Sequence, residues 1–344
     1  MSSSRQASPR SDCVLPMDTR DLRSGLRFIS AGDGEHLGLG WDAVVDLLWG
    51  AFWQKARGLV ENPPKPAVHP RPDSFAHAMP AYLGGSDALG CKWISGYSRQ
   101  SGSGLATVQG LMIVSDAATG YPVCVIEGSW LTAVRTAGVS ALVAARFGRA
   151  SQRLAIVGCG VEGRHHLEAL LHVCPQIKEV RAYSPRPAKA EELLAKAGPR
   201  VRHVAGTAEA AIAESDLVVT ATPMDGRAPV ALAADALAGD SIVLPIDFDR
   251  SWRGNAIHNA SLLCVDDRKQ FEYYRSAQYF SDYPTETTEL AEMIVAPERA
   301  SATGRRFFLN LGLAMTDVAI GAEVWRRAYA SEVGTVIPWR DEYA

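Results

Sequence analysis

Residues 153–163 read Arg-Leu-Ala-Ile-Val-Gly-Cys-Gly-Val-Glu-Gly and decide the fold of this chain. The apolar residues 154–157 predict a buried parallel strand, and the residues that follow the glycines predict a helix. Gly158, Gly160 and Gly163 suit a tight turn, a close approach of the backbone to a pyrophosphate, and close packing of helix on strand. The amides at the helix start would face the phosphates, helped by the helix dipole. The pattern therefore predicts a dinucleotide site rather than a purely structural glycine turn.

The second strand of this unit, residues 180–183, ends where the cofactor is usually selected, about twenty residues beyond the glycines. An acidic residue there would bind the ribose hydroxyls of NAD. This chain has Ser184 and Arg186 instead. A hydroxyl followed by a guanidinium suits a 2′-phosphate, because arginine binds phosphate through several donors. The sequence favours NADP(H); the alternative is a solvated loop arginine and NAD(H).

The composition limits the class of protein. A chain of 344 residues is long enough for two domains with sizeable cores. A net charge of −3 without a basic block argues against a nucleic-acid partner. No apolar run approaches the roughly 20 residues that span a bilayer, so no membrane partner is expected. Residues 1–18 are rich in Ser and Arg and lack the apolar core of a secretory signal, which predicts a disordered tail.

The cysteines and histidines predict neither disulfides nor a metal site. The six cysteines are scattered without a C-x-x-C pair, as expected of reduced thiols in a cytoplasmic protein. His165 and His166 are adjacent, so on a helix they would point in different directions.

The residues before the glycine turn predict a β-rich unit with one helix. The expected strands are residues 26–29, 75–79, 90–94, 105–114 and 122–128, and the helix covers about residues 41–52. Residues 61–72 predict a proline-rich connector and residues 116–120 a hairpin turn. Residues 129–149 predict a long helix that bridges into the second part.

Beyond the glycine turn, strands and helices alternate. Strands are expected at residues 201–204, 216–221, 241–246 and 262–265, and helices at 187–197, 208–214, 229–237 and 309–327. The alternation predicts an α/β fold of Rossmann type, a doubly wound parallel sheet that binds ligands at the carboxyl ends of its strands. Thr220 and Asp247 stand at two such ends, and Thr220 is expected beside the cofactor. The aromatic-rich residues 271–280 predict a loop whose rings serve packing, with a substrate cage as the alternative. The last helix should return to the first part.

Several motifs outside the glycine turn give the chain a resemblance to a known family. They are His77-Ala-Met-Pro-Ala81, Gly90-Cys-Lys92-Trp-Ile-Ser-Gly96, Gly104-Leu-Ala-Thr107, Leu131-Thr-Ala-Val-Arg135-Thr136-Ala137, Thr220-Ala-Thr222, Asp247 and Asn310-Leu-Gly312. With these motifs the chain resembles the ornithine cyclodeaminase/μ-crystallin family over nearly all of its length after residue 20. The Lys92 motif and residues 131–137 are the specific ones.

The resemblance implies a Rossmann domain paired with a β-rich, dimerising domain, bound NAD(H) or NADP(H), and a small amino acid or imino acid as substrate. The corresponding division here is residues 19–130 with 313–344 for substrate binding and dimerisation, and residues 131–312 for the dinucleotide. A homodimer is expected from the family alone.

The resemblance also implies roles for individual residues. Lys92 and Arg135 would hold the substrate carboxylate, with Lys65 where many relatives have an arginine, and His77 and Leu311 would line the same site. Asp247 would be the catalytic acid/base beside Lys92. The residues implied at the cofactor are Thr107, Arg135, Thr136, Gly160, Val161, Glu162, Ser184, Thr222 and Asn310.

The proposed chemistry needs these residue types. Hydride transfer at an α-carbon requires a fixed carboxylate, which two cations provide through charge-assisted bonds. A carboxylate beside the nitrogen can take a proton from an ammonium or stabilise an iminium. The alternatives are a solvent-facing Lys92, a surface ion pair of Arg135 and a core histidine at His77. Asp247 and Asp249 would face opposite sides of a continued strand, and Asp247 is the predicted acid/base.

Two departures from the ornithine-cyclising members predict a different side-chain pocket. Those members have an acidic residue where this chain has His77. They carry Gly-Lys-Thr-Glu after the catalytic aspartate, where this chain has Phe248-Asp-Arg-Ser-Trp252. The leading hypothesis is therefore an NAD(P)-dependent imine reductase or amino acid dehydrogenase. The alternatives are a redox-neutral cyclodeaminase and a cofactor-bound carrier of a small ligand.

Overall fold

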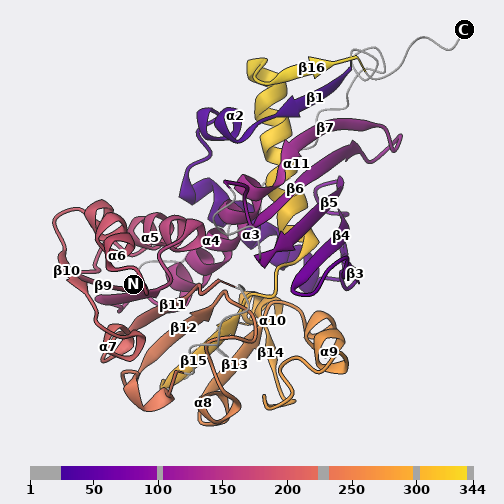
Figure 1. Cartoon of the computed structure of the whole chain (residues 1–344). Helices are drawn as coiled ribbons and strands as arrows, with labels where there is room; N and C mark the ends of the chain where they lie inside the picture. The colour runs from indigo at the N-terminus through magenta and orange to yellow at the C-terminus, as the bar shows by residue number, and fades with distance from the viewer. Residues whose placement is uncertain (1–24, 99–103, 224–231, 297–302, 339–344) are drawn as a thin grey trace, which may run out of the picture.

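The computed structural model describes residues 25–98, 104–223, 232–296 and 303–338, and these form two eight-stranded sheets (Figure 1). The predicted tail at residues 1–18 lies outside the described residues. The first sheet has the order β16-β1-β7-β6-β5-β4-β2, with β3 also paired to β4. Its strands are β1 (Leu26–Ile29), β2 (Val60–Glu61), β3 (Ala67–Val68), β4 (Ser74–Leu83), β5 (Ala88–Tyr97), β6 (Val108–Asp116), β7 (Pro122–Glu127) and β16 (Thr335–Ile337).

One face of the first sheet is covered by the long helix α11 (Ala314–Ser331), which packs on β4, β5 and β6 and on helix α3 (Trp41–Ala56). The short helix α2 (Ala31–His36) precedes α3. Side chains alternate between the two faces of a strand. In β5, Ile94 and Lys92 both point to the covered face, where Lys92 has no solvent exposure. This rules out the alternative of a solvent-facing Lys92.

The second sheet is entirely parallel and has the order β10-β9-β8-β11-β12-β15-β13-β14. Its strands are β8 (Arg153–Val157), β9 (Glu179–Tyr183), β10 (Val201–Val204), β11 (Leu217–Thr220), β12 (Ser241–Pro245), β13 (Leu262–Val265), β14 (Thr288–Glu289) and β15 (Arg305–Leu309). The chain runs outward from β8 in one direction through β9 and β10 and in the other through β11 and β12. The crevice between the ends of β8 and β11 is thus the topological switch point, where such sheets bind ligands.

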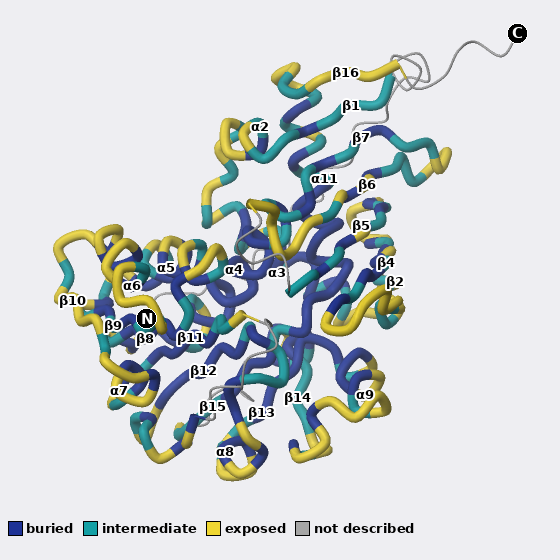
Figure 2. Tube along the Cα trace, in the orientation of Figure 1, coloured by how far each residue is buried: buried dark blue, intermediate teal, exposed yellow. Residues whose placement is uncertain are grey.

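Alternate residues of the second sheet pack into two separate cores. Leu154 and Ile156 of β8 join a core that continues into the first sheet. Ala155 and Val157 join the core on the opposite face. The helices of this part are α4 (Gly128–Phe147), α5 (Val161–Val173), α6 (Pro187–Leu194), α7 (Ala208–Ile212), α8 (Gly254–His258), α9 (Arg268–Ser276) and α10 (Leu290–Val295). Figure 2 shows the central strands and much of α4 and α11 as buried, so the two sheets share one continuous interior.

The doubly wound sheet and the β-rich first part are confirmed, but three predicted segments are wrong. Residues 271–280 are not a loop, because α9 extends to Ser276; Asp267 caps its start by accepting a hydrogen bond from Gln270 N. The last helix does not begin at residue 309, because β15 ends there and Gly312 has a φ of +81°, which a helix does not continue through.

The third wrong segment is the helix expected at residues 229–237. Residues 224–231 lie outside the described part of the chain. Residues 232–237 contain only the 3₁₀ turn Ala234–Ala236, and Leu232 bridges to Trp252. Alanine-rich composition favoured a helix here, but the tertiary pairing with Trp252 prevails over propensity.

None of the helices in the described residues is both long enough and apolar enough to cross a membrane. The predicted domain boundaries fall within the first turns of α4 and just before α11.

Candidate active site

The glycine turn between β8 and α5 gives each glycine a different environment. A Cβ on Gly158, whose φ is +106°, would lie 2.2 Å from Ala221 O at the end of β11. A Cβ on Gly163 would lie 2.2 Å from Gly158 O, so the helix packs directly on the turn. A Cβ on Gly160 would meet nothing within 4 Å. The open side at Gly160, the N-cap of α5, is where the backbone can approach a phosphate.

Asp247 lies just beyond the end of β12, and its carboxylate is bound by hydroxyl and amide donors from the end of β11 and from the loop after β12. Its carboxylate accepts hydrogen bonds from Thr220 Oγ1 at 3.0 Å, from Thr222 N at 3.0 Å and Oγ1 at 2.7 Å, and from Ser251 Oγ. Trp252 Nε1 donates to Thr220 Oγ1 at 3.2 Å and so orients that hydroxyl. Burial raises the pKa of Asp247 above its ordinary value, and these hydrogen bonds oppose the rise.

A second group gathers around Asp317 of α11, a residue that the sequence analysis missed. Lys92 Nζ donates to Asp317 Oδ1 at 2.6 Å and to Thr132 Oγ1 at 3.2 Å, and Arg135 Nε lies 3.4 Å from the same Oδ1. The side chains of Lys92 and Asp317 have no solvent exposure. Arg135 is 8% exposed, which rules out a surface ion pair. Burial lowers the pKa of Lys92 to about 8.

Lys65 joins this group from the connector between β2 and β3. Its Nζ donates to Leu311 O at 2.6 Å and to Gly312 O at 3.1 Å. A Cβ on Gly312 would lie 2.8 Å from Nη1 of Arg135, so the guanidinium packs directly against this glycine. Burial and the neighbouring charges of Arg135 and Lys92 lower the pKa of Lys65 to about 7. We call Lys65, Lys92 and Arg135 the cation cluster.

Two further carboxyls lie within electrostatic reach of the cation cluster. Asp266, just after β13, accepts a hydrogen bond from Gly312 N at 2.9 Å, and Glu162 stands in the first turn of α5. Burial raises the pKa of Asp266 to about 7 and that of Glu162 to about 7. Both groups therefore change protonation state near neutral pH.

Buried polar atoms without a hydrogen-bond partner concentrate in this region of the described chain. They are Arg135 Nε, Glu162 Oε2, Asp266 Oδ1, Gln270 Nε2, Asn310 Oδ1 and Asp317 Oδ2. Almost all buried polar groups in proteins are paired, so such a concentration indicates a place prepared for a polar ligand.

The remaining predicted residues lie around these two groups in different ways. His77 is 9% exposed, bonds Pro66 O through Nδ1, and is kept neutral because burial lowers its pKa to about 4. Thr136 is buried in α4, and its carbonyl accepts from Asn310 Nδ2 at 3.3 Å. Val161 is 52% exposed beside the glycine turn. Thr107 is exposed just before β6, and its carbonyl accepts a hydrogen bond from Tyr97 N.

Ser184 and Arg186 follow the end of β9, as expected from the sequence. Ser184 Oγ accepts a hydrogen bond from Arg186 N at 3.2 Å, and Arg186 is exposed. The guanidinium is therefore accessible to a phosphate in solution.

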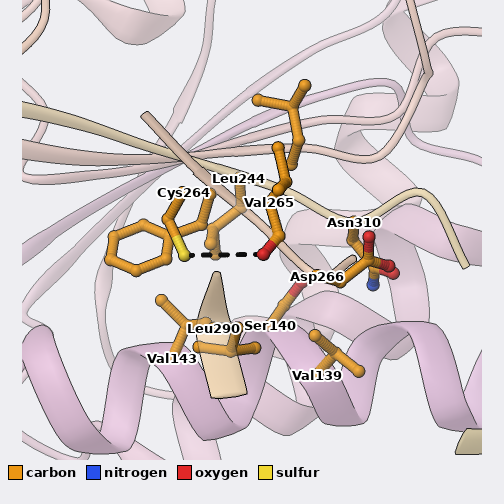
Figure 3. A pocket seen from close by; sticks show the side chains of 11 residues that line it. Val139, Ser140, Val143, Leu244, Cys264, Val265, Asp266, Leu290 and Asn310 are labelled. Atoms are coloured by element: carbon orange, nitrogen blue, oxygen red, sulfur yellow. Dashed lines mark hydrogen bonds between the residues drawn. The ribbon is translucent and has the colours of Figure 1, made fainter. Parts of the chain in front are cut away.

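A small cavity lies under the site, between α4, α10 and the strands β12, β13 and β15 (Figure 3). Apolar side chains such as Val143 and Leu290 line most of it, while Ser140, Asp266 and Asn310 supply polar atoms. It has space for about one water molecule. The cavity is too small for a substrate.

The structure thus brings Lys65, Lys92 and Arg135 together and places His77 nearby. Asp247 contacts a separate set of groups, and its role toward the same substrate stays a prediction. Two members of the site were missed. Asp317 could have been noticed as the one charged residue in the apolar first half of its helix, residues 314–322, where it needs a buried partner. Asp266 follows a strand end, the position that the rule for parallel sheets marks.

These features define the class of protein: a Rossmann-type fold with a glycine turn at its switch point and a buried cation cluster beside it. The fit to a dinucleotide rests on the open side of Gly160, on the α5 N-terminus, which no side chain caps, and on Glu162 Oε2 and Asn310 Oδ1, which have no hydrogen-bond partner. The chain belongs to the ornithine cyclodeaminase/mu-crystallin family, whose model matches residues 36–332. The predicted family and fold class are confirmed.

Individual relatives cover most of the chain. It is 31% identical over 320 residues to the nodulation efficiency protein NfeD of Rhizobium meliloti, covering 91% of this chain and 99% of the relative. It is 27% identical over 307 residues to alanine dehydrogenase of Archaeoglobus fulgidus, covering 86% of this chain and 93% of the relative. The structure of an archaeal alanine dehydrogenase dimer with bound NAD superposes with a TM-score of 0.79 at 26% identity, covering 92% of this chain and 99% of that chain.

Proposed function

We propose that this protein is an NAD(P)(H)-dependent oxidoreductase that interconverts a small amino acid and its imine or keto form by hydride transfer at the α-carbon. The observation that carries the proposal is the cation cluster of Lys65, Lys92 and Arg135, buried beside the glycine turn. Lys92 and Arg135 pair directly with a single carboxylate, Asp317, and Lys65 pairs with backbone carbonyls, so a substrate carboxylate would add a second counter-charge to the cluster. The family and the similarity to alanine dehydrogenases support the same chemistry.

Different residues of this chain would carry out different steps of the reaction. The cation cluster binds the substrate carboxylate and thereby fixes which face of the α-carbon is presented. Asp247, whose pKa burial raises, would accept the proton of the substrate ammonium or return it to the imine nitrogen. A bound nicotinamide supplies or accepts the hydride. His77, neutral at pH 7, adds no further charge to the pocket.

We propose NADP(H) as the preferred cofactor. Ser184 and the exposed Arg186 stand at the end of β9, where a 2′-phosphate would lie, and the described chain has no acidic side chain at residues 184–188.

We also propose the predicted division into a dinucleotide domain (residues 131–312) and a substrate and dimerisation domain (residues 19–130 with 313–344). The proposed compartment is the cytoplasm, which suits the free Cys91, Cys124, Cys159, Cys174 and Cys264.

The test is turnover with a panel of 2-oxo acids plus ammonium or methylamine. We expect the nicotinamide absorbance of NADPH to fall, with a lower KM for NADPH than for NADH. Arg186→Ala should raise the KM for NADPH about tenfold, the cost of one charge-assisted contact, and leave that for NADH unchanged. Ammonia release from a diamino acid without net change in absorbance would indicate a cyclodeaminase instead. Ligand binding without any turnover would indicate a carrier.

We further propose that the protein forms a homodimer through the outer face of the first sheet. On that face Trp93 pairs directly with Leu111, and these residues and Ile113 are 51%, 45% and 40% exposed. Contiguous exposed apolar side chains mark interaction sites. Sedimentation should give twice the mass of the chain, and Trp93→Glu should shift the protein toward monomer. A monomeric wild type at micromolar concentration would contradict this.

A further inference from the structure

A cluster of aromatic rings lies beyond the carboxyl ends of β12 and β13, next to the cation cluster. Phe248 follows Asp247 directly, and its ring is edge-on to Tyr274, Tyr279 and Phe280, with centroid distances of 4.7, 5.0 and 4.7 Å. The last three belong to α9 and the residues after it. The rings therefore connect the loop after β12, which contains Asp247, with α9, which follows Asp266 at the end of β13.

The backbone of Phe248 is strained in a way that functional sites often show. Its φ is +59°, a left-handed conformation that is uncommon for a bulky residue. Such strain persists only where the surroundings impose it, and it clusters at ligand-binding positions. The ring of this residue packs against the aromatic cluster. Phe280 is fully buried, but Phe248 is only partly buried and Tyr279 is 41% exposed, so one side of the cluster remains open.

The aromatic cluster also touches the group that binds the carboxylate. Lys65 Nζ lies 5.6 Å from the centroid of the Tyr274 ring, and the same Nζ donates to Leu311 O and Gly312 O. Tyr274 is 7% exposed. A substrate whose carboxylate lies at the cation cluster and whose nitrogen lies at Asp247 would have its third α-substituent beside Phe248.

We propose that Phe248, Tyr274 and Tyr279 form the side-chain subsite of the substrate and select an apolar side chain, above all an aromatic one. The inference rests on the proposed function and specifies its substrate class. An aromatic side chain would add edge-to-face contacts to the rings already present. A cationic side chain would be repelled by Lys65, Lys92 and Arg135. An anionic side chain would lose its hydration against the rings.

The test compares phenylpyruvate, pyruvate and 2-oxoglutarate, each with methylamine and NADPH. We expect the kcat/KM for phenylpyruvate to exceed the other two at least about tenfold. Phe248→Asn removes the ring, while asparagine tolerates the left-handed backbone. It should lower kcat/KM for phenylpyruvate about 10- to 200-fold and change that for pyruvate by less than about threefold.

A matched pair of variants distinguishes an effect on the subsite from a general loss of stability in α9 and the residues after it. Tyr273 and Tyr279 are both 41% exposed, but Tyr279 contacts Phe248 and Tyr273 contacts Tyr274. We expect Tyr279→Leu to reduce the preference for phenylpyruvate and Tyr273→Leu to leave it intact. Equal effects of both variants, or an equal loss for all three substrates in Phe248→Asn, would overturn the inference.

A binding measurement distinguishes failure of this inference from failure of the proposed function. By calorimetry, 3-phenylpropionate should bind at least about tenfold more tightly than propionate, and Phe248→Asn should abolish the difference. That result without turnover of any substrate would support the subsite and reject the oxidoreductase. Turnover of pyruvate with no preference for either aromatic ligand would reject the subsite and retain the oxidoreductase.

Discussion

Asp317→Ala is expected to lower the free energy of unfolding by about 3–5 kcal/mol, the usual cost of removing one partner of a buried ion pair. Asp317 Oδ1 lies 2.6 Å from Lys92 Nζ and 3.4 Å from Arg135 Nε, and neither Lys92 nor Asp317 is exposed to solvent. The variant would leave two cations buried near Lys65 without their direct counter-charge. Urea unfolding followed by circular dichroism measures the loss.

Glu323→Gln on the same helix is the matched control. Glu323 also pairs with two cations, Arg326 and Arg327, but their side chains are 51% and 29% exposed. Pairs that water can reach contribute less than about 1 kcal/mol. A loss of stability in Asp317→Ala no larger than in this control would contradict the view that Asp317 organises the cation cluster.

The loss of stability in the Asp317→Ala variant, which we call its deficit, should also depend on pH, with a definite sign. Asp317 raises the pKa of Lys92, which burial lowers to about 8 in the wild type. Without Asp317 that pKa falls further, so the folded variant binds fewer protons than the unfolded chain already below pH 8. Stability rises with pH wherever the unfolded state binds more protons. The deficit is therefore expected to be smaller at pH 8 than at pH 6.

Asp247→Asn is expected to lower kcat by about 10²–10⁴-fold, the usual contribution of a positioned acid or base. Asparagine has nearly the same shape and can still accept the hydrogen bond from Thr222 N through its carbonyl oxygen. It cannot take up or return a proton. KM should change little, because the carboxylate of the substrate binds at the cation cluster. The limb of the pH–rate profile set by this carboxyl should disappear.

Asp249→Asn controls for burial and distinguishes the two aspartates. Asp249 accepts a hydrogen bond from Phe280 N at 2.8 Å, and burial raises its pKa above the ordinary value. An asparagine can accept the same bond, so we expect activity within about threefold of wild type. Loss of activity in Asp249→Asn together with normal activity in Asp247→Asn would reverse the prediction.

Local features of the fold could be predicted because they depend on neighbouring residues. The strand, glycine turn and helix at residues 153–173 follow from apolar runs and from the steric needs of Gly158 and Gly163. β15 was missed because Arg305 and Arg306 begin it, leaving too few apolar residues to predict a buried strand. The two arginines lie where the strand enters the sheet, and Arg306 pairs with Asp240 at the surface.

Most residues of the candidate site could be predicted from the sequence, but their positions relative to one another could not. The alternation of side chains along β5 does not show which face of the strand the rest of the chain covers. Whether Lys92 is buried or exposed is therefore decided only by the packing of α11 on β5. The contact of Lys65 with Leu311 O joins residues 246 positions apart. The aromatic residues after β13 were predicted to serve packing rather than to form a substrate cage, since nothing local relates them to Phe248.

The class of fold and the glycine turn follow from the order of residues, because strand and helix periodicity and glycine sterics act over a few residues. The tertiary structure alone decided that Lys65, Lys92 and Arg135 share one buried region with Asp317. Their proximity depends on how the two sheets and α11 pack, and burial, which sets the pKa values of the two lysines, exists only once that packing is complete.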